Sequence, residues 1–154
     1  MEIGHLLTQD RVIPHLKVGA KKQALQELAK RAAQFTGLHE RAIFDVLMER
    51  EKLGTTGVGH GIAIPHGKLA GLDRLYGMFA RLDAPIGFDA IDEQPVDLIF
   101  LLLAPDNAGA DHLKALARVS RLLRDRSFCD KLRGSANADA LYALLTDTPT
   151  SHAA

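Results

Sequence analysis

The stretch VDLIFLLLA, residues 96–104, decides the fold class, because it is apolar at every position except Asp97. A strand with one solvated face would alternate apolar and polar residues, whereas a continuous apolar run of this length is typical of a central strand covered on both faces. Pro105, Asp106 and Asn107 follow, and they end the strand and prepare the start of a helix. The sequence therefore predicts a buried central strand that leads into a helix.

Four segments around this strand show helical spacing. The stretches 21–37 and 39–54 each carry apolar residues on one face and close on a glycine, which is a common helix stop. Residues 111–124 form an amphipathic pattern directly after the central strand, and residues 137–145 predict a last helix. The apolar positions that define the first three helices are Ala24, Leu25, Leu28, Ala29, Ala32 and Phe35; Ile43, Val46 and Leu47; and Leu113, Leu116, Val119, Leu122 and Leu123.

A second strand is predicted over residues 75–82, LYGMFARL, with Pro85 and Gly87 marking the turn after it. Strands buried on both faces that alternate with helices favour an α/β architecture. We expect a single-domain α/β sandwich, with a mostly buried sheet flanked by helices on both faces. The domain should span residues 1–147, with residues 148–154 as a loose polar tail.

Composition bounds the class of protein. The chain has 154 residues, 47% hydrophobic and 25% charged, which fits one soluble globular domain. Lys plus Arg and Asp plus Glu both number 19, so no global charge draws the protein to nucleic acid or to an anionic membrane. The start, MEIGHLLTQDR, lacks the features of a signal peptide. The single cysteine, Cys129, cannot form an internal disulfide, which fits a reducing compartment, and we expect it to be a small buried side chain. We expect a cytoplasmic protein without membrane insertion.

The segment GTTGVGHGIAIPHGK, residues 54–68, is rich in glycine and is expected to form short strands or tight turns that present a loop. His66 follows an alternating run that Pro65 should stop, and Gly67 and Lys68 come next. A histidine there is accessible and largely neutral at physiological pH, and nearby backbone N–H groups can stabilise an anion. These features suit a histidine nucleophile, but a strand-end histidine that only caps a turn fits the spacing equally well.

Two more polar residues interrupt apolar helix faces. His112 is in step with Leu116 and Val119, and Arg50 continues the face of Ile43 and Leu47. Either could mark the rim of the core and extend its head group into solvent. Together they could also supply a guanidinium fork and a second imidazole to a phosphoryl group on a neighbouring histidine.

Other chemistries lack their motifs. The glycine-rich segment does not have the strand–GxxxxGK[ST]–helix order of a nucleotide P-loop. His60 and His66 could bind a metal, but no CxxC or HExxH spacing accompanies them. No nucleophile elbow and no basic stripe with interleaved aromatic residues is present. We expect neither a metal nor another cofactor.

The stretch REKLGTTGVGHGIAIPHGK, residues 50–68, resembles the active-site segment of phosphotransferase-system IIA domains of the fructose/mannitol type, and it is most similar to the nitrogen-regulatory branch, IIA-Ntr. The similarity extends over nearly the whole chain, including VDLIFLLLAP and DHLKALARVSRLLRD. It implies a mixed sheet flanked by helices, with His66 as the phosphorylated residue. His112 and Arg50 match the second histidine and the arginine of the family's active site. His60 departs from the asparagine that is usual between the two glycines.

The resemblance also implies partners. The donor would be a phosphohistidine carrier of the HPr or NPr type, and this protein would be a phosphocarrier more than a turnover enzyme. In the regulatory branch the phosphorylation state controls target proteins, which include potassium-transport regulators or sensor kinases. The alternatives are a sugar-uptake IIA component that passes the group to a separate IIB domain, and a binding module in which His66 is only structural.

Residues near His66 are the candidates for contacting the phosphoryl group or the donor. Thr55, Thr56, Gly57, Gly67 and Lys68 are expected in the phosphoryl-binding loop or the docking surface. A modest apolar patch should surround the histidine, because a carrier binds its donor only briefly. The aliphatic candidates for this patch are Val58, Ile62, Ile64 and Leu69.

Overall fold

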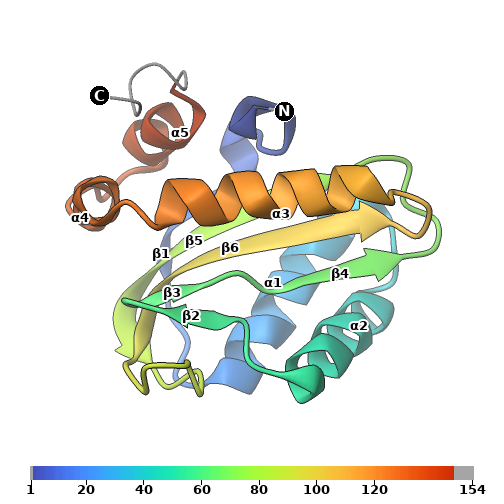
Figure 1. The fold of residues 1–154 in the computed structure, drawn as a ribbon, viewed down its shortest axis with the longest axis horizontal. Helices are drawn as coiled ribbons and strands as arrows, with labels where there is room; N and C mark the ends of the chain where they lie inside the picture. Colours follow the sequence, from blue (N-terminus) through green and yellow to red (C-terminus); the bar gives the residue numbers. More distant parts are fainter. Residues whose placement is uncertain (1, 148–154) are drawn as a thin grey trace.

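Strand β6 (Val96–Pro105) is the centre of a mixed six-stranded sheet in the computed structural model, which describes residues 2–147 (Figure 1). It is antiparallel to β5 (Tyr76–Ile86), and β5 is parallel to the edge strand β1 (Val12–Leu16). On its other side β6 is parallel to two short strands in succession, β3 (Ile62–Ala63) and β4 (His66–Leu69). Strand β2 (Gly57–Gly59) completes the sheet, antiparallel to β3.

Helices cover both faces of this sheet, as Figure 1 shows. One face packs against α1 (Lys21–Thr36) and α2 (Glu40–Leu53). The other packs against α3 (Ala110–Leu123), α4 (Arg126–Arg133) and α5 (Ala138–Thr146). Alternate residues of β6 enter the two cores, Ile99, Leu101 and Leu103 on the α1–α2 side and Leu98, Phe100 and Leu102 on the α3–α5 side. Both faces of β6 are therefore buried, which explains its continuous apolar run.

The predicted helices are present, and their ends follow the expected chemistry. Gly37 ends α1 with φ 74°, a left-handed conformation that glycine adopts without strain. Asn137 caps α5 by accepting the N–H of Ala140. The second predicted strand is longer than expected: β5 continues through Pro85 to Ile86, and the turn begins only after it. The register with β6 shifts after Arg81, which lets a residue without an N–H lie within the strand.

Besides two single-turn 3-10 helices near the start of the chain, Ile3–His5 and Gln9–Arg11, one strand and one α-helix were not predicted from the sequence. Strand β1 contains Pro14, which normally argues against a strand but is tolerated here because β1 lies at the edge of the sheet. Helix α4 is short, and the Asp125 side chain starts it by accepting the N–H of Phe128 at 3.1 Å. Cys129 of this helix is buried, as the sequence predicted. The predicted tail, 148–154, lies outside the described residues.

Between residues 2 and 147, no helix combines the length and the apolarity that crossing a bilayer requires.

Candidate functional site

His66 begins strand β4, so its place in the sheet differs from the prediction. We expected a strand over residues 62–65 with His66 at its end. The structure shows that β3 stops at Ala63, because Pro65 has no N–H to donate to the sheet. The carbonyl of Pro65 accepts the N–H of Leu102 at 3.0 Å, which keeps the chain beside β6. The chain then re-enters the sheet at His66. Strand β4 has β6 as its only partner among the described strands, so the imidazole lies at a free edge of the sheet.

The backbone selects the tautomer of His66. The ring Nδ1 lies 2.8 Å from the carbonyl oxygen of Ile64. Because a carbonyl oxygen can only accept a hydrogen bond, Nδ1 carries the ring proton. Nε2 then holds a lone pair, and the Nε–H of Arg50 donates to it at 3.2 Å. The nitrogen that is free to attack an electrophile is therefore Nε2, with a guanidinium already beside it.

Arg50 reaches His66 because α2 packs closely against β4. Gly67 makes this approach possible, since a Cβ at that position would overlap the Cγ1 atom of Val46 on α2. The guanidinium is half-buried, and its NH1 group donates to the carbonyl of Gly54 at 2.7 Å, just past the end of the helix. This second hydrogen bond holds the Arg50 side chain against the C-terminal end of α2. Arg50 is thus positioned by two contacts and not by charge alone.

His112 approaches from the opposite helical layer. It lies in the first turn of α3 and is 7% exposed, and its ring centroid lies 5.7 Å from that of His66 with the planes inclined at 51°. Its Nδ1 is buried and has no hydrogen-bond partner in the described part of the chain. No such contact fixes the tautomer of His112, so the ring can present either an N–H or a lone pair to a group placed beside it.

Burial keeps both imidazoles neutral. Desolvation lowers the pKa of His66, the hydrogen bond to Ile64 opposes this, and the charge of Arg50 lowers the pKa further. The pKa of His112 is lowered by desolvation first and then by His66 and Lys68. A histidine with a lowered pKa has its lone pair available at physiological pH, which is what a nucleophile needs.

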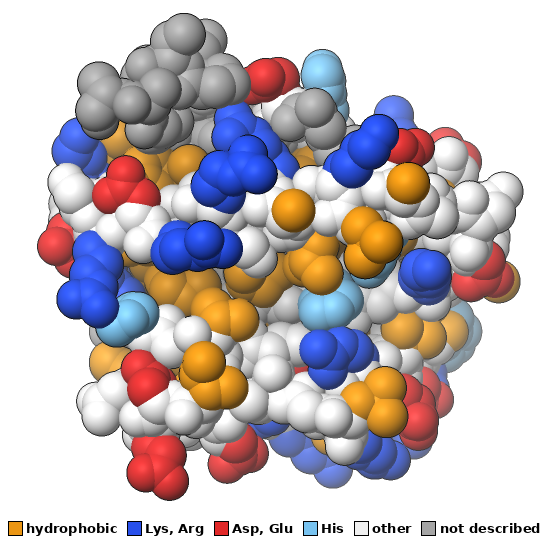
Figure 2. Space-filling view, viewed as in Figure 1, with side chains coloured by type: hydrophobic (Ala, Val, Ile, Leu, Met, Phe, Trp, Pro, Cys, Tyr) orange, Lys and Arg blue, Asp and Glu red, His pale blue; other side chains and the backbone are white. Residues whose placement is uncertain are grey.

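These residues surround a shallow hollow of about 360 Å³ between α2, β4 and the start of α3. Figure 2 shows histidine and Lys or Arg side chains meeting near the middle of this face, with hydrophobic side chains on either side. Leu53 and Leu113 are exposed apolar residues next to the site, at 86% and 66%. The lining is Val46, Glu49, Arg50, Leu53, His66, Gly67, Lys68 and His112.

The other three loop candidates do not line the hollow. The Thr55 hydroxyl donates to the carbonyl of Phe88 at 3.0 Å and accepts the N–H of Gly57 at 3.0 Å. Thr56 is buried, and both its N–H and its hydroxyl bind the carboxylate of Glu51, whose pairing with Lys21 at 2.9 Å completes a buried polar cluster. These contacts hold the chain between α2 and β2 in place. Gly67 and Lys68, in contrast, do lie beside His66.

The prediction of an apolar patch around His66 is wrong for three of its four residues. Ile62, Ile64 and Leu69 are at most 5% exposed, and none of them lines the hollow at His66; Ile62 and Ile64 lie at the bottom of a different hollow. Only Val58 is exposed, at 47%, and it lines a different hollow. The exposed apolar residues at the site are instead Leu53 and Leu113, which were not predicted as members of this patch. Leu53 directly precedes the predicted helix end at Gly54, and Leu113 directly follows His112.

The described residues do not provide a set of metal ligands. Within residues 2–147 no group of three His, Cys, Asp or Glu side chains could hold a metal ion. His60, the other histidine of the glycine-rich segment, does not line the hollow, and its Nε2 accepts from Arg126 at 2.9 Å.

The comparison with protein families decides which family this fold belongs to. The family model described as "Phosphoenolpyruvate-dependent sugar phosphotransferase system, EIIA 2" matches residues 5–148. The chain belongs to this EIIA 2 family. The resemblance seen in the sequence, down to the nitrogen-regulatory branch, is therefore confirmed by the relatives described next.

Relatives of this EIIA 2 protein include a nitrogen regulatory protein of Bradyrhizobium diazoefficiens, 60% identical over 99% of this chain and 100% of the relative. The crystal structure of the nitrogen regulatory protein IIA-Ntr from Neisseria meningitidis is 38% identical, with a TM-score of 0.89 over 94% of this chain and 99% of that one. The mannitol IIA enzyme of Escherichia coli, solved in complex with phosphorylated mannitol IIB, shares the fold at 18% identity, with a TM-score of 0.78 over 92% of this chain and 98% of that one.

Proposed function

We propose that this EIIA 2 protein accepts a phosphoryl group on Nε2 of His66 from a phosphohistidine carrier of the HPr or NPr type, and that it regulates target proteins according to its phosphorylation state. The observation that carries the proposal is the pair of contacts on the His66 ring. Nδ1–H is held by the carbonyl of Ile64, and the Nε2 lone pair faces the guanidinium of Arg50. The relatives named nitrogen regulatory protein favour regulation over sugar uptake.

The transfer is a direct displacement. Nε2 of His66 attacks the phosphorus, a new N–P bond forms as the N–P bond of the donor histidine breaks, and the electron pair of that bond returns to the donor ring. His66 keeps its proton on Nδ1, so no base is needed. In such reactions the protein contributes mainly positioning and charge stabilisation.

Arg50 and His112 supply that stabilisation. The guanidinium that donates to Nε2 in the free protein can swing its N–H groups to the equatorial phosphoryl oxygens as the nucleophile engages. His112, whose tautomer no protein contact fixes, donates an N–H from the other side. Lys68 adds a positive charge at the rim. None of the three needs to accept the group itself.

The shape of the site suits a carrier. A shallow hollow with exposed Leu53 and Leu113 beside it allows a second protein to bring its own phosphohistidine to His66 and to leave again. After transfer, the phosphoryl group adds net negative charge at the centre of this face. Targets that cover the face with acidic or apolar surface are then expelled, and basic ones are retained. The same face thus serves both the donor and the targets, in the cytoplasm.

The test is phosphorylation of the purified protein by a phosphoenolpyruvate-driven donor system, read by intact mass. One phosphoryl group should be added, and it should be labile in acid and stable in base, as a phosphoramidate is. His66→Ala should abolish the addition, whereas His60→Ala, a matched histidine outside the hollow, should leave it intact. Phosphorus–nitrogen coupling should place the group on Nε2. Normal phosphorylation of the His66→Ala protein, or a group on Nδ1, would contradict the assignment.

The regulatory part needs its own measurement. Affinity of a target protein should differ between the phosphorylated and the unmodified form, and the difference should disappear in His66→Ala. Equal affinity for both forms, with phosphorylation intact, would leave a phosphocarrier that passes the group onward and would favour the IIB acceptor.

A further inference from the structure

A second hollow, of about 420 Å³, lies on the same face of the molecule between the β2–β3 turn and the junction of α3 with α4. Figure 2 shows hydrophobic side chains at its bottom, with Lys or Arg side chains and a histidine around it. Its size falls in the range of small-molecule sites, which combine an apolar lining with a few polar groups. The apolar lining consists of Val58, Ile62, Ile64, Leu123 and Cys129.

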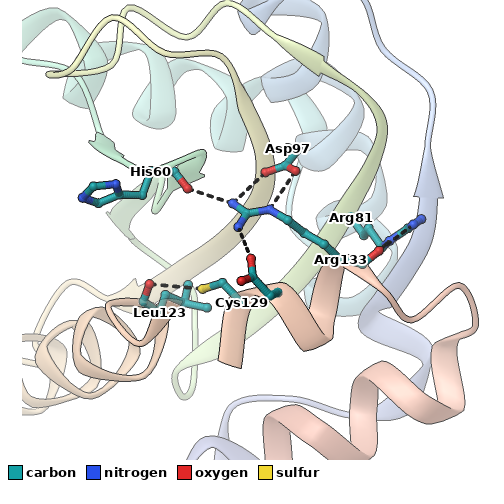
Figure 3. Close-up of polar contacts among 7 residues, drawn as sticks. His60, Arg81, Asp97, Leu123, Cys129 and Arg133 are labelled. Carbon is teal, nitrogen blue, oxygen red and sulfur yellow. Dashed lines mark hydrogen bonds and ion pairs between the residues drawn. The ribbon is translucent and has the colours of Figure 1, made fainter. Parts of the chain in front are cut away.

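The turn at the mouth of this hollow is held rigidly. His60 and Gly61 have φ values of 56° and 82°, a left-handed conformation that is uncommon for residues other than glycine. The N–H of His60 donates to Asp92 at 2.9 Å, and its carbonyl accepts from NH2 of Arg133 at 2.7 Å. Figure 3 shows the second of these contacts, with the His60 ring directed away from Arg133. The backbone therefore fixes where the imidazole stands.

The guanidinium of Arg133 is engaged in contacts within the protein. Its guanidinium forms a two-pronged ion pair with Asp97, at 2.9 and 3.1 Å, and also contacts Asp130 at 3.4 Å (Figure 3). Its backbone carbonyl accepts two hydrogen bonds from Arg81. The one carboxylate that lines the hollow, that of Asp130, is thus already paired. Arg133 therefore has no charge left for a ligand, and because Asp97 and Asp130 share its one positive charge, the three residues together carry one net negative charge.

Arg124 and Arg126 are different. The Arg124 side chain is exposed and forms no hydrogen bond or ion pair with another described residue, and the Arg126 side chain hydrogen-bonds only to Nε2 of His60, at 2.9 Å. Asp125, which separates them in the chain, uses its carboxylate to cap α4. Two guanidinium groups without an ion-pair partner among the described residues therefore lie beside the apolar bottom of the hollow, and their two positive charges exceed the one net negative charge of Arg133, Asp97 and Asp130. Such a combination attracts a group that carries a negative charge on an apolar body.

We propose that this hollow is a binding site for a small amphipathic organic anion, whose apolar body packs on the floor between Ile62 and Leu123 and whose anionic group pairs with Arg124 and Arg126. The site is separate from the phosphoryl site, because none of its lining residues also lines the hollow at His66. It is nevertheless adjacent, since the side chain of Ile64 lines this hollow while its carbonyl holds Nδ1 of His66.

The test uses two fluorescent probes with the same rings, anilinonaphthalene sulfonate and the uncharged phenylnaphthylamine. The sulfonate should bind in a 1:1 complex and about tenfold more tightly than the uncharged probe, since one charged hydrogen bond is worth that much. Amide chemical-shift changes should map to Val58, His60 and Leu123. Arg124→Gln combined with Arg126→Gln should weaken the sulfonate about tenfold and leave the uncharged probe unchanged.

Matched controls separate this site from the rest of the protein. Arg121→Gln changes an exposed arginine of the same helix that does not line the hollow, and it should have no effect. Val58→Glu places a like charge at the mouth and should weaken the sulfonate, whereas Ile91→Glu, also exposed but outside the lining, should not. His66→Ala should bind the sulfonate normally, so failure of the phosphoryl assignment would not affect this test. Equal affinity for the two probes, equal losses in Arg121→Gln, or shifts centred on His66 would overturn the proposal.

Discussion

The two hollows lie at opposite ends of α3 and each contains a side chain that could act as a nucleophile, yet the surroundings activate only one. His112 at the start of α3 belongs to the His66 site, and Leu123 at its end belongs to the second hollow, which contains Cys129. At His66, burial and Arg50 lower the pKa, so the ring is neutral and ready to attack. At Cys129, burial raises the pKa to about 11, so the thiol stays protonated.

The same physical effect, desolvation, therefore has opposite consequences for the two groups. Burial disfavours the charged form of either side chain, but the reactive form of histidine is the neutral one and that of cysteine is the anion. The polar contacts follow this difference. The N–H of His66 is bound so that Nε2 is left free, whereas the Cys129 thiol donates to the carbonyl of Leu123 at 3.2 Å. Burial raises the pKa of that thiol, and the positive charge of Arg133 opposes the rise only in part. The fold thus favours the reactive form of the side chain at His66 and the unreactive form at Cys129, which is also buried.

The largest expected effect is at the guanidinium of the His66 site. Arg50→Ala should slow phosphoryl transfer by about 10²–10³, the cost of removing one positioned donor. Arg50→Lys should recover only part of the rate, because an ammonium cannot reproduce the planar fork. Single-turnover rates with the phosphorylated donor measure both. Arg41→Ala, on the exposed face of the same helix, is the control, and an unchanged rate in Arg50→Ala would make this arginine structural.

The next largest effect is expected where β4 packs against α2 at Gly67. Gly67→Ala should destabilise the protein by about 1–3 kcal/mol, because the new methyl group overlaps Val46 and pushes α2 away from β4. Phosphoryl transfer should slow as well, since Arg50 moves with the helix. Val46→Ala in the same protein should restore much of both. Urea denaturation measures the stability, and Gly87→Ala, where a Cβ meets nothing within 4 Å, is the matched control. A Gly67→Ala protein of normal stability would show that the contact is easily relieved.

The second hollow offers the complementary test. Cys129 should react with Ellman's reagent at least about tenfold more slowly than a free thiol near neutral pH, because few molecules carry the thiolate and the greater basicity offsets this only in part. Denaturant should bring the rate to that of an ordinary cysteine. Rapid labelling of the native protein would mean that the thiol is neither buried nor held by Leu123.

The smallest effect is on stability against pH. His66 and His112 both have pKa values below the unfolded value, so the unfolded chain binds more protons as the pH falls. Their neutral forms stabilise the fold above about 6.5, and this contribution is lost as the pH drops toward the folded pKa values. Denaturation curves above and below that pH should show the loss, and a protein with both His66→Gln and His112→Gln should show less of it. An NMR titration that places either pKa above the ordinary value would reverse the sign.

Local chemistry predicted most of the elements. The continuous apolar run of residues 96–104 identified the central strand because both of its faces are buried, and glycines at 37 and 54 identified two helix ends. Strand β1 was missed because Pro14 is acceptable only at a sheet edge, and the chain alone does not show which strand will be at the edge. Helix α4 was missed because its stability comes from Asp125 and from packing of Phe128 and Leu132, not from length.

The sequence by itself determined the alternation of strands and helices, because it depends on residue type and spacing along the chain, and its resemblance to known members indicated the family. It also singled out His66, Arg50 and His112 as candidates, which the structure brings to one hollow. Only the tertiary structure decided that Nε2 is the free nitrogen, that Gly67 serves the packing of α2, and that Ile62, Ile64 and Leu69 are buried. It also decided that His60 and Arg126, far apart in the chain, meet at a second hollow. Tautomer, side-chain direction and long-range contact all depend on what the folded chain places opposite a residue, and no local pattern records that.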